Sequence, residues 1–379
     1  EGGLEALGEP AHATCETCHG CTHRLDYLNM VIQFKEKQIK MQSGNTAATI
    51  YDARDVNGTM SVVKVHGVFS PMVTEAKRES MRRSYPEGVH YKANEQAIAA
   101  FVQSLTDASG LASVETREWL GLLRAVDPSS GERIEERQGI FAEYAAGSSV
   151  EALTLHFGGP QLVEVMSSIP NDTILNAAFY DFVFSQSDRH GENVFVTPEG
   201  EMILIDTRDN FLDFQGTDSV FLPGTFIFER NRVGNSHMFN PSAPETTHHH
   251  PQLLLDYRCV VPGGAIGTDF PPRLRAFMER VLELDRAGRV VEELKFPTSA
   301  IDANKRAAAL VSRCKDLLEK GFEGALKAGL KRKSSQNMPT EGYDWPEPCC
   351  RLQFMGGSGY KCISSEPRLT TPSDAAQQK

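Results

Sequence analysis

The chain has 379 residues, of which 40% are apolar and 23% charged, and its formal net charge is −11. The apolar content is enough for a hydrophobic core and excludes a wholly disordered chain. No run approaches about 18 consecutive apolar residues, so no membrane span is expected. The acidic balance argues against nucleic acid as the main partner. At about 150 residues per domain, the length fits one large two-lobed unit or two domains.

The cysteines are grouped mainly near the two ends of the chain. They are Cys15, Cys18, Cys21, Cys259, Cys314, Cys349, Cys350 and Cys362. An even number grouped in this way is typical of disulfides that join terminal arms to a globular body, which requires an oxidising compartment. The glycosylation sequons at Asn57 and Asn171 fit the same compartment. Because the chain begins with Glu1, we interpret it as a processed or truncated product. We therefore expect the secretory pathway (the Golgi lumen) or the extracellular space.

The first cysteine group has three possible uses. The stretch Cys15-Glu16-Thr17-Cys18-His19 matches the c-type haem attachment pattern, and the same side chains could bind zinc or form a disulfide knot. The additional Cys21 and His23 favour the disulfide knot. The run His248-His249-His250 has no adjacent Cys or carboxylate, which favours a solvated loop over a metal site.

The first half of the chain predicts mostly strands. Residues 1–24 are small, polar and without period, and indicate a Cys-rich arm. From Met30 to about Val68 apolar and polar residues alternate, and Asn57-Gly58 predicts a hairpin turn. Between residues 93 and 105 apolar residues recur every three or four positions, which predicts a helix. Its apolar face consists of Ile98, Phe101, Val102 and Leu105. Residues 139–144 predict a short buried strand closed by Gly147.

The second half predicts mostly helices. Residues 173–187 are apolar nearly all round, which indicates a central helix. Two short strands follow, at 194–196 and 202–205, with a turn at 198–200. Residues 213–270 indicate an irregular insert, 272–294 and 302–328 two amphipathic helices, and the last fifty residues an extended tail. The fold class is therefore α+β in a two-lobed arrangement. The expected divisions are an arm (1–24), an N-lobe (25–146), a C-lobe (147–330) and a Cys-containing tail (331–379).

The segment Asp188-Arg189-His190-Gly191-Glu192-Asn193 carries the most chemical information. Asp188 and Asn193 are five positions apart, and Asp206 follows thirteen positions after Asn193. A kinase catalytic loop has the same Asp-to-Asn gap, followed by a metal-binding Asp. A loop leaving a core helix can present one carboxylate to an acceptor hydroxyl, while an amide oxygen and a second carboxylate hold a divalent metal on phosphate oxygens.

Residues upstream supply the other parts of a nucleotide site. Lys64 lies in a predicted strand, from which its ammonium could reach the phosphates, and Glu95 lies on the buried side of the following helix, where it could hold Lys64. Gly44 and Asn45, within Ser43-Gly44-Asn45-Thr46, could form a turn over the phosphates. We also assign Glu143, at the end of the predicted strand 139–144, to the nucleotide site.

At these residues the sequence resembles known kinase families. The stretch from Phe179 to Phe184 that leads into Asp188-Arg189-His190 resembles the secretory-pathway kinases of the FAM20 and four-jointed type, and residues 97–101 are similar to their regulatory helix. The stretches 191–193 and 204–206 are similar to the actin-fragmin kinase and phosphoinositide 3/4-kinase branch. The resemblance covers about residues 40–215. It implies a two-lobed protein-kinase-like fold that uses ATP with Mn²⁺ or Mg²⁺.

The expected function is phosphorylation of a protein or glycan hydroxyl in the secretory pathway. Asp188 would accept the proton of the acceptor hydroxyl, and Asn193 and Asp206 would hold the metal. Asn193 points to the phosphoinositide-kinase type of metal arrangement, so a lipid kinase is one alternative. The other is a catalytically silent kinase-fold subunit of an extracellular assembly.

Overall fold

The computed structural model describes part of the chain. The described residues are 100–111, 145–156, 159–207, 217–232, 251–296, 303–332, 345–356 and 359–368, with the backbone of the strands at 31–33, 49–54, 60–65, 118–126 and 133–143. The chain divides into two compact units, residues 1–96 with 117–144, and residues 97–116 with 145–379. The expected boundary between residues 146 and 147 stays a prediction, and the Cys-rich arm and the His run lie outside the described residues.

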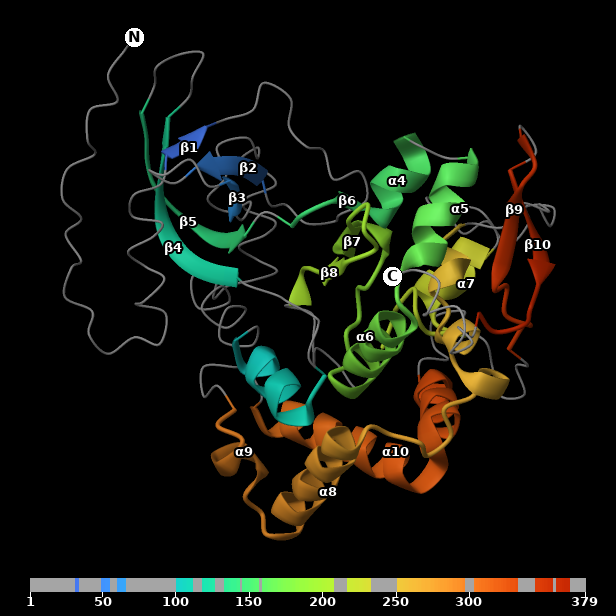
Figure 1. Ribbon diagram of the computed structural model, residues 1–379. Coiled ribbons are helices and arrows are strands. Elements are labelled where there is room, and N and C mark those ends of the chain that lie inside the picture. Colours follow the sequence, from blue (N-terminus) through green and yellow to red (C-terminus); the bar gives the residue numbers. More distant parts are fainter. Residues whose placement is uncertain are drawn as a thin grey trace. The chain divides into compact units, whose positions relative to one another are not determined.

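The first unit contains one five-stranded sheet that closes into a barrel (Figure 1). Its strands are β1 (Val31–Gln33), β2 (Thr49–Arg54), β3 (Met60–Val65), β4 (Glu118–Val126) and β5 (Arg133–Glu143). The order is β1-β2-β3-β5-β4, and β1 closes the sheet by pairing antiparallel with β2 and parallel with β4. The predicted pairing of the strands on either side of Asn57-Gly58 is confirmed, with Ile50 opposite Lys64. Strand β4 was not predicted.

The helix predicted at 93–105 is described over residues 100–109 and belongs to the second unit. Phe101, Val102 and Leu105 are buried, as the apolar spacing predicts. The ring centroids of Phe101 and Phe296 lie 4.4 Å apart. The apolar face of this helix therefore forms part of the core of the second unit.

Helix α6 (Asn171–Val183) is the central helix of the second unit. Its side chains are buried from Ala177 to Val183, because the helix is apolar nearly all round. The predicted end at residue 187 is wrong. The helix ends at Val183, and Ser185 adopts a positive φ of 55°, which breaks the helical path and directs the chain into the loop that begins at Gln186.

A small antiparallel sheet lies beside α4 (Val150–His156) and follows the order β6-β7-β8. Its strands are β6 (Ser148–Ser149), β7 (Val194–Val196) and β8 (Met202–Leu204), and the last two confirm the predicted strand pair. Gly147 precedes β6 with φ of 82°, and a Cβ there would collide with the backbone carbonyl of Val196. This position therefore requires glycine.

The remaining helices include α5 (Gly159–Ser168), α7 (Phe226–Arg232), η3 (Pro251–Leu255), η4 (Tyr257–Val260), η5 (Pro262–Gly264), α8 (Pro272–Arg286), α9 (Val290–Glu293) and α10 (Ala303–Arg332). Of these, η4 and α10 pack against α6. The described part of the predicted irregular insert thus combines short helices with turns and stretches without regular structure. The predicted helix at 272–294 is divided into α8 and α9, and α10 breaks at Gly321, whose φ is 70°.

Within the extended tail predicted at 331–379, two strands pair antiparallel, β9 (Arg351–Phe354) and β10 (Tyr360–Ser364). The disulfide Cys259–Cys350 joins the tail to the body, and Cys349–Cys362 joins the residues before β9 to β10. Arg368 donates hydrogen bonds to the carbonyls of Met166, Ser167 and Leu254. Disulfides and hydrogen bonds therefore hold the tail on the body, and Leu352 adds its buried side chain to the core.

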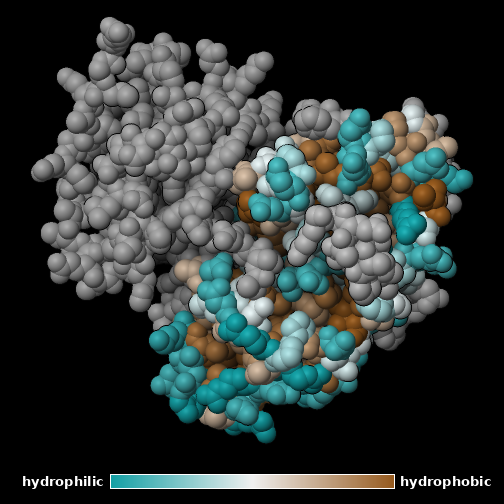
Figure 2. Space-filling view, viewed as in Figure 1, coloured by the Kyte–Doolittle hydropathy of each residue, from teal (hydrophilic) through white to brown (hydrophobic). Residues whose placement is uncertain are grey.

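The described surface is polar over α8. In Figure 2 hydrophilic side chains cover the lower part of the second unit, where α8 lies in Figure 1. Exposed ion pairs on α8 include Arg280 with Glu283. Within the described residues, no helix has the length and apolarity that crossing a membrane requires. The mixed content of strands in one unit and mainly helices in the other confirms the α+β class.

Candidate functional site: the loop between α6 and β8

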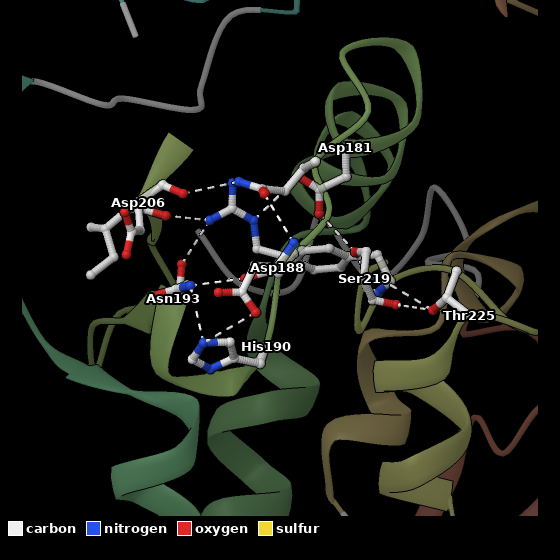
Figure 3. A network of polar contacts seen from close by, with 11 residues as sticks. Asp181, Asp188, His190, Asn193, Asp206, Ser219 and Thr225 are labelled. Carbon is white, nitrogen blue, oxygen red and sulfur yellow. Dashed lines mark hydrogen bonds and ion pairs between the residues drawn. The ribbon is translucent and has the colours of Figure 1, made fainter. Parts of the chain in front are cut away.

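The candidate site is built on the segment between α6 and Thr207 (Figure 3). Its loop is tied to a second segment by backbone hydrogen bonds, because the N–H of Arg189 donates to the carbonyl of Asp218 and the N–H of Val220 donates to the carbonyl of Arg189. Ser219 Oγ in turn donates to Asp181 on α6, with 2.7 Å between the oxygens. Buried hydrogen bonds thus fix the loop to residues 218–220, and Ser219 fixes those residues to α6.

Asn193 and Asp188 are in direct contact. The Nδ2 of Asn193, at the end of η1 (Gly191–Asn193), donates to the backbone carbonyl of Asp188 at 2.9 Å. The same Nδ2 lies 3.2 Å from Nε2 of His190. The amide nitrogen of Asn193 thus faces groups of its own loop, and its Oδ1 is the atom suited to a cation.

Arg189 is the largest fully buried side chain of the unit and joins three elements. Its Nε donates to Oδ1 of Asp181 at 3.2 Å, and its Nη1 donates to the carbonyls of Asn193 and Ile205. One guanidinium thus connects α6, the end of η1 and the residue before Asp206. Arg189 therefore braces the loop from within.

The ion pair between Asp181 and Arg189 is completely buried. Burial raises the pKa of the Asp181 carboxyl above its ordinary value of 3.8, and the charge of Arg189 together with the hydrogen bond from Ser219 opposes that rise. The carboxyl and the guanidinium are therefore strongly interdependent, because removing either charge leaves the other without its partner in a site that excludes water.

Asp206 follows β8 and has an unusual backbone. Its φ is 59°, in the left-handed region that few residues other than glycine adopt. The neighbouring N–H of Ile205 donates to the carbonyl of Asn193 at 3.1 Å. This hydrogen bond fixes the backbone immediately before Asp206 to the backbone of Asn193. Backbone strain of this kind is concentrated at functional positions.

The oxygen donors of this site suit a hard divalent cation. Asn193 offers an amide oxygen and Asp206 a carboxylate, and Mg²⁺ is commonly held by one or two carboxylates together with waters and substrate phosphates. Over the described ranges, no group of three or more His, Cys, Asp and Glu side chains is arranged as a metal site of its own. Asn193 and Asp206 are therefore the described residues of this loop that could hold such a cation.

The other predicted site residues belong to the first unit or lie outside the described part. Lys64 is in the middle strand β3, flanked by β2 and β5, and Glu143 is the last residue of β5. Gly44, Asn45 and Glu95 are outside the described residues. Because the two units are described separately, the convergence of Lys64 with Asp188 and Asp206 stays a prediction.

Three polar residues of the site were not predicted from the sequence: Asp181, Gln186 and Ser219. A signal was available for Asp181, since a charged residue within an otherwise apolar helix requires a buried partner. Gln186 and Ser219 carry no such signal. Their side-chain contacts with Asp188 and Asp181 depend on the path that the chain takes when it is folded.

Comparison with known proteins adds little to this geometry. No family model matches the sequence, and no curated protein matches it. Among solved structures, the chain is similar to the pseudokinase domain of BIR2, an immune regulator of the RLK/Pelle family, with 14% identity over 86% of this chain and 94% of that chain and a TM-score of 0.25. A TM-score of this size carries no argument, so the class of protein is inferred from the residues and their contacts.

Proposed function

We propose that the chain is an atypical kinase with a two-lobed protein-kinase-like fold, which transfers phosphate from ATP to a protein or glycan hydroxyl in the secretory pathway. The observation that carries the proposal is the hydrogen bond from Asn193 to Asp188. Asp206 follows shortly after β8, which begins after Asn193 and β7. The sequence spacing alone predicts these three residues as base and metal ligands. Hydrogen bonds from Arg189 and Gln186 hold the backbone at or beside all three residues. A base and two metal ligands that act on one phosphoryl group need such fixed positions.

The chemistry assigns one task to each residue. Asn193 and Asp206 would hold the metal, which would supply positive charge to neutralise the transferred phosphoryl group. Asp188 accepts the proton of the acceptor hydroxyl while that oxygen bonds to the γ-phosphorus, and the bond from this phosphorus to the β-phosphate oxygen breaks to release ADP. The side chain of Asp188 is 45% exposed, so an acceptor can approach it. Lys64, supported by Glu95, would bind the α- and β-phosphates, with Gly44, Asn45 and Glu143 lining the nucleotide.

The compartment is supported by the cysteines. Cys259–Cys350 and Cys349–Cys362 lie at disulfide distance, which is compatible with a secretory or extracellular location. Asn171, one of the two sequons, donates its side-chain amide to the carbonyl of Arg368 at 3.0 Å. A glycan on that nitrogen would compete with the docking of the tail, so Asn57 is the sequon that we assign to glycosylation.

The test is a thermal shift with ATP in the presence of Mn²⁺ or Mg²⁺. We expect the wild type to be stabilised only when nucleotide and metal are both present. Asp206→Ala should abolish the shift, whereas Asp188→Ala should keep the shift and lose phosphate transfer. Asp285→Ala, which removes an exposed carboxylate from the last turn of α8, is the matched control and should behave as the wild type.

The outcomes separate the proposal from its alternatives. If the wild type shows no metal-dependent shift, the kinase proposal fails and a silent kinase-fold subunit becomes the better interpretation. If Asp206→Ala shifts as much as the wild type, the metal assignment fails. If phosphate is transferred to inositol lipids in vesicles and not to protein or glycan acceptors, the enzyme is a lipid kinase.

A further inference from the structure

The side-chain amide of Gln186 connects the backbones of the two candidate catalytic carboxylate residues. Gln186 is fully buried, and its Nε2 donates to the carbonyl of Asp206 at 3.0 Å. Its Oε1 accepts from the N–H of Asp188 at 3.1 Å. The two residues are eighteen positions apart in the sequence and come from different segments, the loop after α6 and the chain after β8.

Gln186 is itself held in place from both sides. Its backbone N–H donates to the carbonyl of Asp181 at 2.8 Å, and its carbonyl accepts from the N–H of Asp218 at 2.8 Å. The preceding residue, Ser185, has a positive φ of 55°, so the chain turns sharply immediately before the glutamine. These backbone contacts therefore fix the point from which the side chain of Gln186 extends to its two partners.

A primary amide suits this position. One end of the group must donate and the other must accept, and the planar amide of Gln186 does both without a change of protonation. A methionine of similar length would leave the Asp188 N–H and the Asp206 carbonyl without these partners in a buried place. A glutamate would keep the acceptor for Asp188 but direct an oxygen at the carbonyl of Asp206.

The contact also bears on the unusual backbone of Asp206. A residue with φ of 59° persists only where its surroundings stabilise it, and the hydrogen bond from Gln186 acts on the carbonyl of that same residue. Without it, the backbone of Asp206 would be free to leave this conformation, and its carboxylate would move with it.

From this geometry we infer that Gln186 is a positioning residue, which fixes Asp188 and Asp206 relative to each other so that base and metal act on one phosphoryl group. The inference rests on the proposed kinase function. Gln186 touches neither substrate nor metal in this role, because its contacts are to backbone atoms. Partners of this kind behind metal ligands typically change metal affinity or activity by about 10- to 100-fold.

The experiment compares Gln186→Met and Gln186→Glu with the wild type. The concentration of Mn²⁺ that gives a half-maximal ATP-dependent thermal shift is measured, together with phosphate transfer. We expect both variants to need about 10- to 100-fold more Mn²⁺. The control is Val281→Ala, a core substitution on α8 away from the loop, which should lower the melting temperature and leave the Mn²⁺ requirement unchanged.

The Gln186→Glu variant supplies a readout that a merely structural role would not move. When the pH falls from about 8 to about 6, the buried carboxyl introduced at position 186 would gain a proton and again donate to the carbonyl of Asp206. The Mn²⁺ requirement of Gln186→Glu should then approach that of the wild type, while that of Gln186→Met should not. If Gln186→Met fails to fold, Gln186→Glu and its pH profile still provide the test.

Failure of the inference differs from failure of the proposed function. If the wild type binds nucleotide with metal and both variants bind with the same Mn²⁺ requirement, the positioning role is overturned and the kinase proposal stands. If the wild type itself shows no metal-dependent binding, the kinase proposal is overturned, and the positioning role with it.

Discussion

The side-chain amide of Asn193 donates a hydrogen bond to the backbone carbonyl of Asp188, with 2.9 Å between Nδ2 and O. A residue expected to bind metal thus holds the backbone of the residue expected to act as base. The two functions cannot be varied independently, because a change in the orientation of the Asn193 amide also moves the loop that carries Asp188.

Asn193→Ala and Asn193→Asp should therefore have different effects. Both lose the donor to Asp188, so we expect each to lower the free energy of unfolding by about 1–3 kcal/mol. Asn193→Asp keeps an oxygen ligand and should retain metal-dependent ATP binding, whereas Asn193→Ala should lose it. Urea unfolding and thermal shifts with Mn²⁺ measure the two effects. Equal metal dependence in both variants would remove Asn193 from the metal site.

Arg189→Met should destabilise the protein strongly and in a pH-dependent way. Removing one partner of a buried ion pair costs about 3–5 kcal/mol at neutral pH. Without Arg189 the raised pKa of Asp181 rises further, since the opposing charge is gone. A carboxyl with a raised folded-state pKa stabilises the fold below its unfolded value of 3.8, and that stability is lost as the pH rises through the folded-state pKa.

The stability deficit of Arg189→Met should consequently be largest near neutral pH and shrink as the solution becomes acidic. Urea unfolding at a series of pH values measures it. Arg280→Met, which removes an exposed ion pair with Glu283, is the control and should change stability by less than about 1 kcal/mol at every pH. A deficit that does not vary with pH would contradict the coupling between Asp181 and Arg189.

The regular elements of the second unit could be predicted because burial and period agree. The buried faces of the helix at 100–109 and of α8 follow from apolar residues at three- and four-residue spacing, and β7 and β8 follow from short apolar runs around a turn. The end of α6 could not be predicted in this way. Phe184 is as apolar as the helix before it, and the break depends on the φ of Ser185.

The tail and the bracing of the site depend on contacts distant in sequence. The hairpin of β9 and β10 has little periodicity, and its position depends on Cys259, which lies 91 residues before Cys350. Spacing predicts Asp188, Asn193 and Asp206 as a group because they lie on one continuous stretch. The contact of Ser219 with Asp181 crosses 38 positions and joins two segments that only the folded chain brings together.

The two disulfides should contribute unequally to stability. In the chain-entropy model, a bond that closes a loop of about 100 residues stabilises by about 4.7 kcal/mol, and one that closes about 15 residues by about 3 kcal/mol. Cys259→Ser with Cys350→Ser should therefore cost more than Cys349→Ser with Cys362→Ser, since the loops span 91 and 13 positions. Unfolding measurements on the two double variants give the difference in stability. Peptide mapping of the wild type without reductant establishes which cysteines are joined.

Peptide mapping also tests the pairing itself. Cys349 and Cys350 are adjacent, so the opposite pairing is a simple alternative in the oxidised chain. Finding Cys259 joined to Cys349 would contradict the described linkage. Cys314 is buried as a free thiol, and burial raises its pKa to about 12. It should react with alkylating reagents only after unfolding.

Gly191, in the loop between Asp188 and Asn193, should not tolerate a side chain while Gln252 is present. A Cβ at Gly191 would lie 2.9 Å from Cδ of Gln252, which is buried and donates to Glu151. Gly191→Ala should thus cost about 1–3 kcal/mol through overpacking and displace the loop between Asp188 and Asn193. Urea unfolding and phosphate transfer measure the two consequences.

The double variant Gly191→Ala with Gln252→Ala distinguishes a clash from a requirement of the backbone. Gly191 has no positive φ, so its conformation suits alanine once the obstructing side chain is gone. The double variant should be more stable than the sum of the two single changes predicts. Gly329→Ala in α10, where a new Cβ meets no atom within 4 Å, should be neutral or stabilise by up to about 1 kcal/mol. Strict additivity at Gly191 and Gln252 would show that the glycine serves the backbone of the loop and not the space beside it.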